Sequence, residues 1–211
     1  PGDAGDNEPD LALAQFLDRM RHPPLSESWA RMRGTVQHKA DGQALIKAPI
    51  EVRALFSPRR TLAQLQFNDQ ERYSVAQTFS EGLKGTTVIR EREAKTGEKT
   101  LSDLGIRPGD LTLSFLYWDF VEELPSQSLK TRRCRVLKLR NPAGDEEVVA
   151  WVTKSEAFPL RVSWYRVGET ERYRELEFTG FEKQQDIWIV KRVQVYNRGW
   201  KTVLEFSDIT I

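Results

Sequence analysis

The residue types that most often carry out catalysis or bind metals are scarce in this sequence. Its two histidines, His22 and His38, stand at the end of a predicted helix and at the end of a charged predicted strand, with no nucleophile or metal ligand beside them. Cys134 is the single cysteine, which excludes an internal disulfide and a paired-cysteine metal or redox site. The sequence therefore predicts no catalytic triad and no metal site.

Carboxylates and glycines give equally little support for an enzyme. Adjacent acidic residues occur at Glu122-Glu123 and at Glu146-Glu147, but neighbouring residues of a strand point to opposite faces, so neither pair can act together as acid and base. Neither of the glycine-rich phosphate-binding patterns is present, so no nucleotide and no other cofactor is predicted. A hydrolase that brings distant carboxylates together is the least favoured hypothesis.

A cluster of basic residues forms the strongest local charge. It consists of Lys130, Arg132, Arg133 and Arg135. The simpler interpretation is the solvated start of a strand. The alternative is a contact for an acidic partner or for an anionic lipid headgroup, and thus a peripheral contact with a membrane.

The composition is typical of a globular chain, and it lacks the excess of basic residues that is typical of nucleic-acid-binding proteins. The 211 residues include 32 basic and 31 acidic ones, which gives a net charge of +1. No apolar run approaches the roughly 20 residues of a membrane-spanning helix. We expect residues 1–7 to be a disordered leader and residues 8–211 to form one domain. The first residue is Pro1 rather than methionine, and we expect that a secretory signal peptide preceded it.

The spacing of apolar residues predicts few helices and many strands. Apolar residues from Leu11 to Met20 recur at helical spacing until His22 and two prolines end the pattern, and a second short helical pattern spans Leu111 to Trp118. Alternating patterns separated by short polar turns predict about eleven antiparallel strands. Their ranges are 28–38, 44–56, 60–67, 72–79, 86–93, 132–140, 147–153, 160–167, 172–182, 186–196 and 201–210.

The last strands are apolar on both faces, which requires cover on two sides. One face would present Ile187, Ile189, Val193 and Val195, and the other Trp188, Val190 and Tyr196. Because two short helical elements cannot cover both faces of so many strands, we predict a mainly β fold with few helices. It would be an open, curved antiparallel half-barrel, covered on its concave side by the N-terminal helix and the middle helical segment. Charges such as Arg31, Arg33, Lys201 and Glu205 would protect its edges.

A concave face covered by only two short helical elements predicts an apolar cavity. The candidate cavity residues are Ile46, Ile50, Val52, Phe56, Leu65, Phe67, Phe115, Leu116, Trp118 and Phe120. The candidate lid residues, on the N-terminal helix, are Leu13, Phe16, Leu17 and Met20. Each of these side chains also suits an ordinary core.

Several segments, in order, resemble the outer membrane lipoprotein-sorting protein family, whose members share the fold of the carrier LolA and the receptor LolB. These segments are FLYW from Phe115, LKTRRCRVLKLRNP from Leu129, VVAWVTKSEAFPLRVSWY from Val148 and TVLEFSDI from Thr202. Thr153 stands where members commonly have aspartate. The position equivalent to the functional arginine of the carrier is not identified.

The resemblance implies a binding protein of the periplasm or cell envelope rather than an enzyme. Its cavity would shield the acyl chains of a lipoprotein or of another lipid, and its partners would be the lipid or acylated cargo and envelope proteins that donate and accept it. The alternative hypothesis is an envelope interaction or sensor domain that binds a protein segment in the same concavity.

Overall fold

The computed structural model describes residues 11–22, 28–57, 59–80, 83–184 and 187–211. The predicted leader of residues 1–7 lies outside these ranges. Twelve strands form one antiparallel sheet. Their bounds are β1 (Ser28–Ala40), β2 (Ile46–Phe56), β3 (Arg60–Phe67), β4 (Glu71–Ser80), β5 (Leu83–Arg92), β6 (Asp119–Leu129), β7 (Arg132–Arg140), β8 (Glu146–Thr153), β9 (Pro159–Arg166), β10 (Arg174–Gln184), β11 (Ile187–Tyr196) and β12 (Trp200–Thr210).

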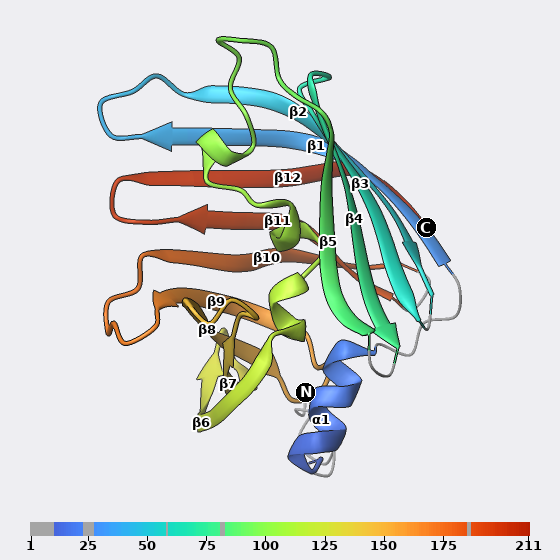
Figure 1. Cartoon of the computed structure of the whole chain (residues 1–211), viewed down its shortest axis with the longest axis vertical. Helices are drawn as coiled ribbons and strands as arrows, with labels where there is room; N and C mark the ends of the chain where they lie inside the picture. Colours follow the sequence, from blue (N-terminus) through green and yellow to red (C-terminus); the bar gives the residue numbers. More distant parts are fainter. Residues whose placement is uncertain (1–10, 23–27, 58, 81–82, 185–186) are drawn as a thin grey trace, which may run out of the picture.

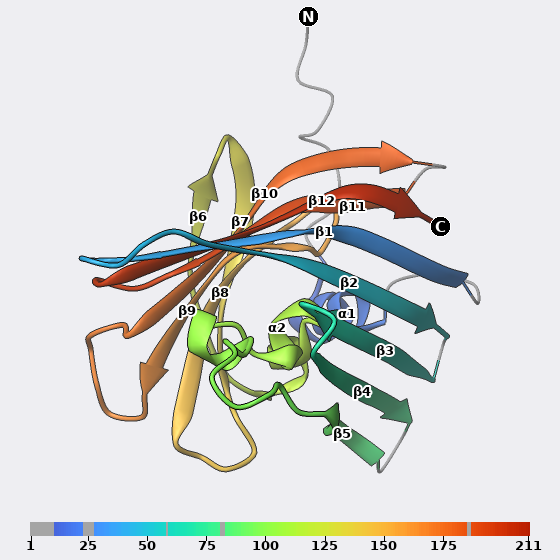
Figure 2. The same ribbon diagram turned by 90° about the horizontal axis from the view of Figure 1, so that it is seen from above.

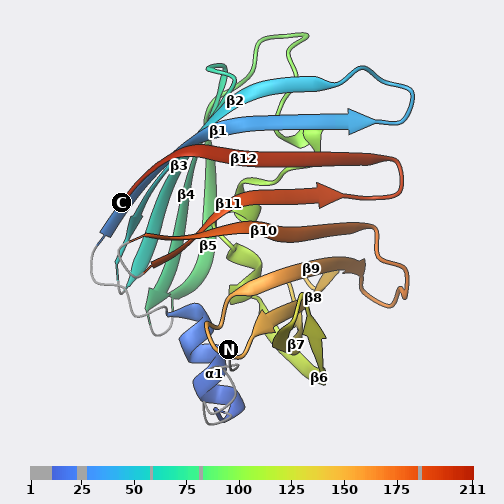
Figure 3. The ribbon, with the colours of Figure 1, turned by 180° about the vertical axis from the view of Figure 1, so that it is seen from behind.

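Two meanders that pair through the first and last strands make up the sheet. Its strand order is β5-β4-β3-β2-β1-β12-β11-β10-β9-β8-β7-β6. The join between β1 and β12 contains an irregularity at Gly34, and Figure 3 shows the two strands side by side. Strands β5 and β6 lie at opposite ends of the order and do not pair in the described part of the chain, so the sheet stays open. The predicted open, curved half-barrel is confirmed.

The expectation about the sheet edges was wrong. Arg31 and Arg33 lie on β1, and Lys201 and Glu205 lie on β12, where Thr35 pairs with Glu205 and Lys39 pairs with Lys201. These strands adjoin each other inside the sheet, because the two ends of the chain meet rather than form its borders. The edges are β5 and β6, in the middle of the sequence.

This arrangement explains the position of the helical segments. The chain must pass from β5 at one edge to β6 at the other, and the connection crosses one face of the sheet. It carries the short helices η1 (Ser102–Leu104), α2 (Pro108–Leu111) and η2 (Ser114–Tyr117). The helix α1 (Leu13–Arg21) lies on the same side. Figures 1 and 2 show α1 and the helical connection within the curve of the sheet. We call this the concave face and its opposite the outer face.

Alternation along the strands decides which side chains reach the concave face. On β2, Ala48, Ile50 and Val52 are buried, whereas Lys47, Pro49 and Arg53, which point to the opposite face, are exposed. The same alternation on β3 buries Ala63, Leu65 and Phe67. These inward side chains belong to one core with side chains from β7–β12 and from the helical segments.

A buried ion pair fixes the helical connection to the sheet. Arg174 on β10 donates to Asp110 on α2, with an Nη1–Oδ1 distance of 3.1 Å, and its guanidinium lies 4.5 Å from the ring centre of Trp164. Both charged side chains are almost fully buried. The Trp164 ring also packs edge-to-face against Phe115, with ring centres 5.3 Å apart. The middle of the connection is therefore part of the core.

The predicted set of elements differs from the structure in the middle of the chain. Strand β6 had no predicted counterpart, because most of its side chains are exposed and its pairing with β7 has two irregularities. The helical pattern predicted for Leu111 to Trp118 is divided between the end of α2 and η2. Among the described helices, none has the length and apolar character needed to cross a membrane.

Candidate functional site

Inward side chains of β2 and β3 form the centre of the predicted cavity wall. Ile50 pairs with Phe67 and Val52 pairs with Leu65 across the two strands. All four are buried, with exposed fractions of 2 % or less. The fold brings these predicted residues together because they occupy alternate positions on adjacent antiparallel strands.

The middle segment of the chain packs against this wall. Phe115 and Leu116 on η2 are buried, whereas Trp118 and Phe120 are partly buried at the margin of the same core. Ile46 at the start of β2 is also at this margin. Phe56, at the far end of β2, is half-buried and lies outside the core cluster. Apart from Phe56, the predicted wall residues thus belong to one core on the concave face.

Helix α1 covers the wall with the predicted lid residues. Phe16 and Met20 are buried against the core, and Leu13 and Leu17 are partly buried beside them. No side chain caps the N-terminus of the helix. At its C-terminus, Arg21 donates to the carbonyl oxygens of Leu116 and Trp118 at 3.0 and 2.8 Å. Helix α1 is therefore held by two buried side chains, by Arg21 at its C-terminus and by Arg135, which donates to the carbonyl oxygen of Leu11 just before its start.

The predicted basic cluster does not act as one charged surface. Arg135 points to the concave side, where it is buried and donates to both carboxylate oxygens of Glu123 at 2.6 and 2.7 Å. Arg132 pairs with Glu156, and Lys130 pairs with Glu177 at 3.7 Å. Arg133 is exposed. Alternation along β7 places Arg132 on the face opposite to Arg135, and burial distinguishes Arg135 from the exposed Arg133.

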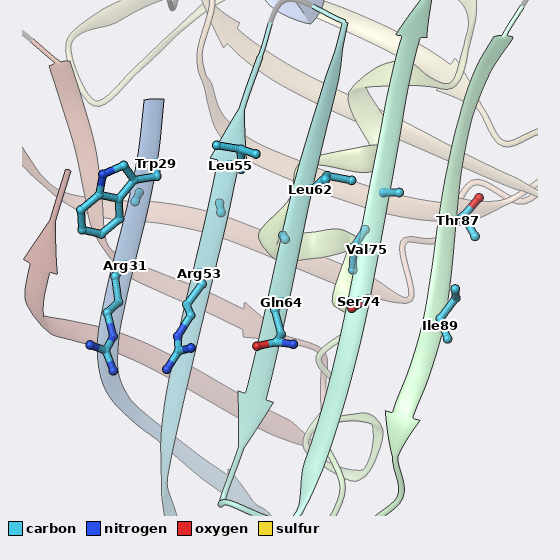
Figure 4. A pocket seen from close by; sticks show the side chains of 14 residues that line it. Trp29, Arg31, Arg53, Leu55, Leu62, Gln64, Ser74, Val75, Thr87 and Ile89 are labelled. Atoms are coloured by element: carbon cyan, nitrogen blue, oxygen red, sulfur yellow. The ribbon is translucent and has the colours of Figure 1, made fainter. Parts of the chain in front are cut away.

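Two hollows stand out on the described residues, and the predicted wall lines neither of them. The larger, about 590 Å³, lies on the outer face of β1–β5 (Figure 4). The smaller, about 230 Å³, lies beside three phenylalanines, Phe158, Phe178 and Phe181, and the cations Lys130 and Arg132. Phe158 packs edge-to-face against both of the other rings.

The larger hollow was not found from the sequence. Its side chains come from five strands, and they become neighbours only when each register is known: Trp29 pairs with Leu55, Leu55 with Leu62, and Leu62 with Ala76. One feature of the sequence could have indicated it: several successive strands each carry an apolar residue at an outward-facing position. We call the surface formed by Trp29, Leu55, Leu62, Ala76, Thr87, Ile89, Arg31, Arg53, Gln64 and Ser74 the outer groove.

The histidines and the cysteine have local structural contacts. His38 is buried, its Nδ1 lies 2.7 Å from Thr202 Oγ1, and burial lowers its pKa. His22 contacts Asp18 one turn earlier on α1, at 2.9 Å. Cys134 is buried, which raises the pKa of its thiol. Among the residues that the structure describes, no three His, Cys, Asp or Glu side chains gather into a group that could hold a metal.

Solved structures that share this fold include the following three. A DUF1329 family protein from Desulfovibrio piger has a TM-score of 0.71 and 16 % identity, covering 92 % of this chain and 90 % of that one. A domain from Vibrio parahaemolyticus, named for outer membrane lipoprotein sorting, has a TM-score of 0.62 and 15 % identity, covering 93 % and 89 %. A LolA superfamily protein from Nitrosomonas europaea has a TM-score of 0.58 and 14 % identity, covering 95 % and 94 %.

At these identities the likeness establishes the fold, which is LolA-like. No curated protein matches the chain. A family model described as that of an uncharacterized protein matches residues 86–211, from β5 through β12. Because this match covers more than half of the sequence, the chain belongs to that uncharacterized protein family.

Proposed function

We propose that the protein is a carrier of the periplasm or cell envelope that shields acyl chains of a lipoprotein or of another lipid between α1 and the concave face. One observation carries this proposal: the apolar wall on β2 and β3 is covered by short helical segments, not by a second sheet. The lipoprotein-sorting name of one structural neighbour agrees with the proposed cargo and compartment.

The concave wall has the chemistry that an acyl chain needs. Each methylene removed from water contributes about 0.8 kcal/mol, so a long chain represents on the order of 10 kcal/mol. A continuous apolar surface of that kind runs from Ile50 and Val52 to Leu65 and Phe67. In the structure, Phe16 and Met20 of α1 cover the core to which this wall belongs. An incoming acyl chain would displace these two side chains.

Helix α1 is suited to move. It has 9 residues, and isolated helices shorter than about 12–15 residues are marginal in water, so its helical state depends on packing against the sheet. Its fixed end is the contact of Arg21 with the carbonyl oxygens of Leu116 and Trp118. Loss of these contacts would loosen the C-terminal end of the helix, while Arg135 still donates to the carbonyl oxygen of Leu11 at its start and the sheet behind it keeps its pairing.

Alanine substitution of Arg21 tests the proposal. In a purified Arg21→Ala variant, we expect the rate of uptake of a brominated fatty acid to rise severalfold, followed through quenching of Trp118 at the margin of the core. Lys47→Ala is the matched control, because Lys47 is an exposed cation on the outer face of β2. Uptake that is unchanged in a folded Arg21→Ala protein, or total quenching that Trp118→Phe leaves unreduced, would contradict the concave site.

A second candidate function is an interaction or sensor domain that binds a protein segment in the same concavity. The observation that favours it is that an amphipathic helix, α1, already packs on the concave face and buries Phe16 and Met20 there. Mass spectrometry of the purified protein distinguishes the carrier function from the interaction or sensor function. Co-purified lipid supports the carrier, whereas binding of a helical peptide by a protein that takes up no fatty acid supports the second function.

We propose no catalytic role. The structural neighbours named for LolA and for lipoprotein sorting agree with a binding protein. A panel of ester and glycoside substrates checks this point, and turnover of any of them above the rate of a buffer blank would require a different function.

A further inference from the structure

The outer groove has an apolar row that runs across the strands. Outward positions of β1, β2, β3 and β4 place Trp29, Leu55, Leu62 and Ala76 in successive cross-strand pairs. The row ends near Ile89 on β5 (Figure 4). Trp29 is 53 % exposed, Leu55 47 % and Ile89 58 %. Three large apolar side chains are thus exposed around one hollow.

The outer face of the other meander is covered differently. There, Arg161 forms an ion pair with Glu177 and its guanidinium lies 5.7 Å from the ring centre of Trp151. Lys138 and Arg140 both pair with Glu147 beside it. Long charged side chains cover apolar surface in this way while their charges stay hydrated. The apolar row of β1–β5 lacks such a cover in the described part of the chain.

Three arginines stand at one end of the groove, on β1 and β2. Arg31 forms two hydrogen bonds with Glu51 at 3.0 and 3.2 Å, Arg33 contacts the same carboxylate at 3.2 Å, and Arg53 also donates to it through Nε. Asp208 lies 3.5 Å from Arg33. Three guanidinium groups therefore face two carboxylates at this end of the groove, and a third carboxylate, that of Glu91, accepts hydrogen bonds from the groove residues Gln64 and Ser74.

One of these arginines, Arg53, has N–H donors that are not used in these hydrogen bonds. Within the described ranges, Arg53 makes its hydrogen bond through Nε, and its two terminal nitrogens form no hydrogen bond or ion pair. The Arg53 side chain is 55 % exposed, and Arg31 is 35 % exposed on the adjacent strand (Figure 4). Guanidinium groups bind carboxylate and phosphate oxygens through such paired donors. This end of the groove suits an anion.

We propose that the outer groove binds a single-chain lipid with an anionic headgroup. The headgroup lies at Arg31 and Arg53, and the chain follows Leu55 and Leu62 toward Ile89. Five strands spaced about 4.8 Å apart give the groove a length of roughly 19 Å. One leaflet of a bilayer has a hydrocarbon thickness of roughly 15 Å, so one acyl chain fits. A volume of about 590 Å³ is also within the range of roughly 300–1,000 Å³ found for small-molecule sites.

This site is separate from the proposed carrier cavity. It lies on the opposite face of β2 and β3, where Leu55 and Leu62 point away from the core that contains Val52 and Leu65. The Arg21→Ala change in α1 would therefore leave the outer groove intact. The two sites can be tested independently in one protein.

Tryptophan quenching by 9,10-dibromostearate locates the bound chain. We expect quenching of Trp29, which lies in the groove, to disappear in Trp29→Phe and to persist in Trp118→Phe. Palmitate affinity should fall at least tenfold in the double variant Arg31→Gln/Arg53→Gln, whereas the affinity for hexadecanol, an uncharged chain of the same length, should change less than twofold. Leu62→Asp should weaken both ligands.

Lys47→Gln is the matched control, since it removes a cation from the same face of β2 outside the groove. Each variant is compared after its unfolding curve shows an intact fold. Equal palmitate affinity in the control and the double arginine variant would overturn the proposal. So would a dimer in light scattering that Leu62→Asp dissociates, because a second copy of the chain would then be the occupant of the groove.

Discussion

The guanidinium of Arg135 lies 4.7 Å from the centre of the Phe16 ring, which joins β7 to helix α1. The same side chain donates to both oxygens of Glu123 and, at 2.8 Å, to the carbonyl oxygen of Leu11 just before the helix. One buried cation thus contacts the face and the start of α1, while Arg21 holds its end. The position of helix α1 is set at both ends by arginines.

We expect Arg135→Lys to loosen α1. Lysine keeps the charge but lacks the planar fork that bonds both oxygens of Glu123, so the protein should lose about 1–3 kcal/mol of unfolding free energy. Amide hydrogen exchange within residues 13–21 should accelerate more than exchange in the sheet. Arg132→Lys, on the same strand but half-exposed, should change stability by less than about 0.5 kcal/mol. Equal exchange rates in both variants would contradict this role of Arg135.

Gly34 allows the two meanders to join. A Cβ atom at this position would lie 2.0 Å from the carbonyl oxygen of Glu205 on β12, which is backbone and cannot rotate away. We expect Gly34→Ala to lower the unfolding free energy by more than about 2 kcal/mol in urea titrations. Gly85→Ala is the control, because an added Cβ there has no atom within 4 Å. Similar unfolding free energies for the two variants would show that the pairing of β1 with β12 can accommodate a Cβ atom at position 34.

The buried pair of Arg174 and Asp110 should respond non-additively to substitution. Arg174→Met leaves the Asp110 carboxylate buried without its partner, which we expect to destabilise the protein by about 3–5 kcal/mol. The double variant Arg174→Met/Asp110→Leu should recover part of this loss, although Asp110 also accepts a hydrogen bond from the Arg107 amide at 2.7 Å. A double-mutant cycle based on thermal unfolding measures the coupling. Additive losses would mean that the two charges act separately.

Alternation and turn chemistry were sufficient to predict much of the sheet. Ile50, Val52 and Phe67 were placed on one face by position alone, and the structure buries all three. One of the short polar turns forms at Asn141, between β7 and β8, because the side-chain carbonyl oxygen of Asn141 accepts hydrogen bonds from the amides of Gly144 and Asp145. Local patterns suffice where each strand has one buried face.

Strand β6 and the outer groove could not be predicted in the same way. Strand β6 contains Pro125, has few buried residues and pairs only with β7, so its sequence lacks the alternation of a central strand. The groove depends on five registers at once, and Trp29 and Ile89 are far apart in the sequence. The basic cluster near Lys130 is visible in the sequence because its charges are close together along the chain. Arg31 and Arg53, by contrast, become neighbours only through the pairing of β1 with β2.

Acid should weaken the arginine cluster at the outer groove. The hydrogen bond from Arg31, assisted by Arg53 and Arg33 and opposed by burial, lowers the pKa of Glu51 to about 2. An unfolded glutamate has a pKa of about 4.3, so the ionised group stabilises the folded state above that pH and loses this effect as the pH falls toward 2. We expect the stability difference between the wild type and Glu51→Gln to shrink by about 1 kcal/mol between pH 6 and pH 2, since the arginines are partly exposed. Urea unfolding at several pH values measures it. A constant difference over this range would mean that Glu51 titrates normally and that its carboxylate does not hold the three guanidinium groups together.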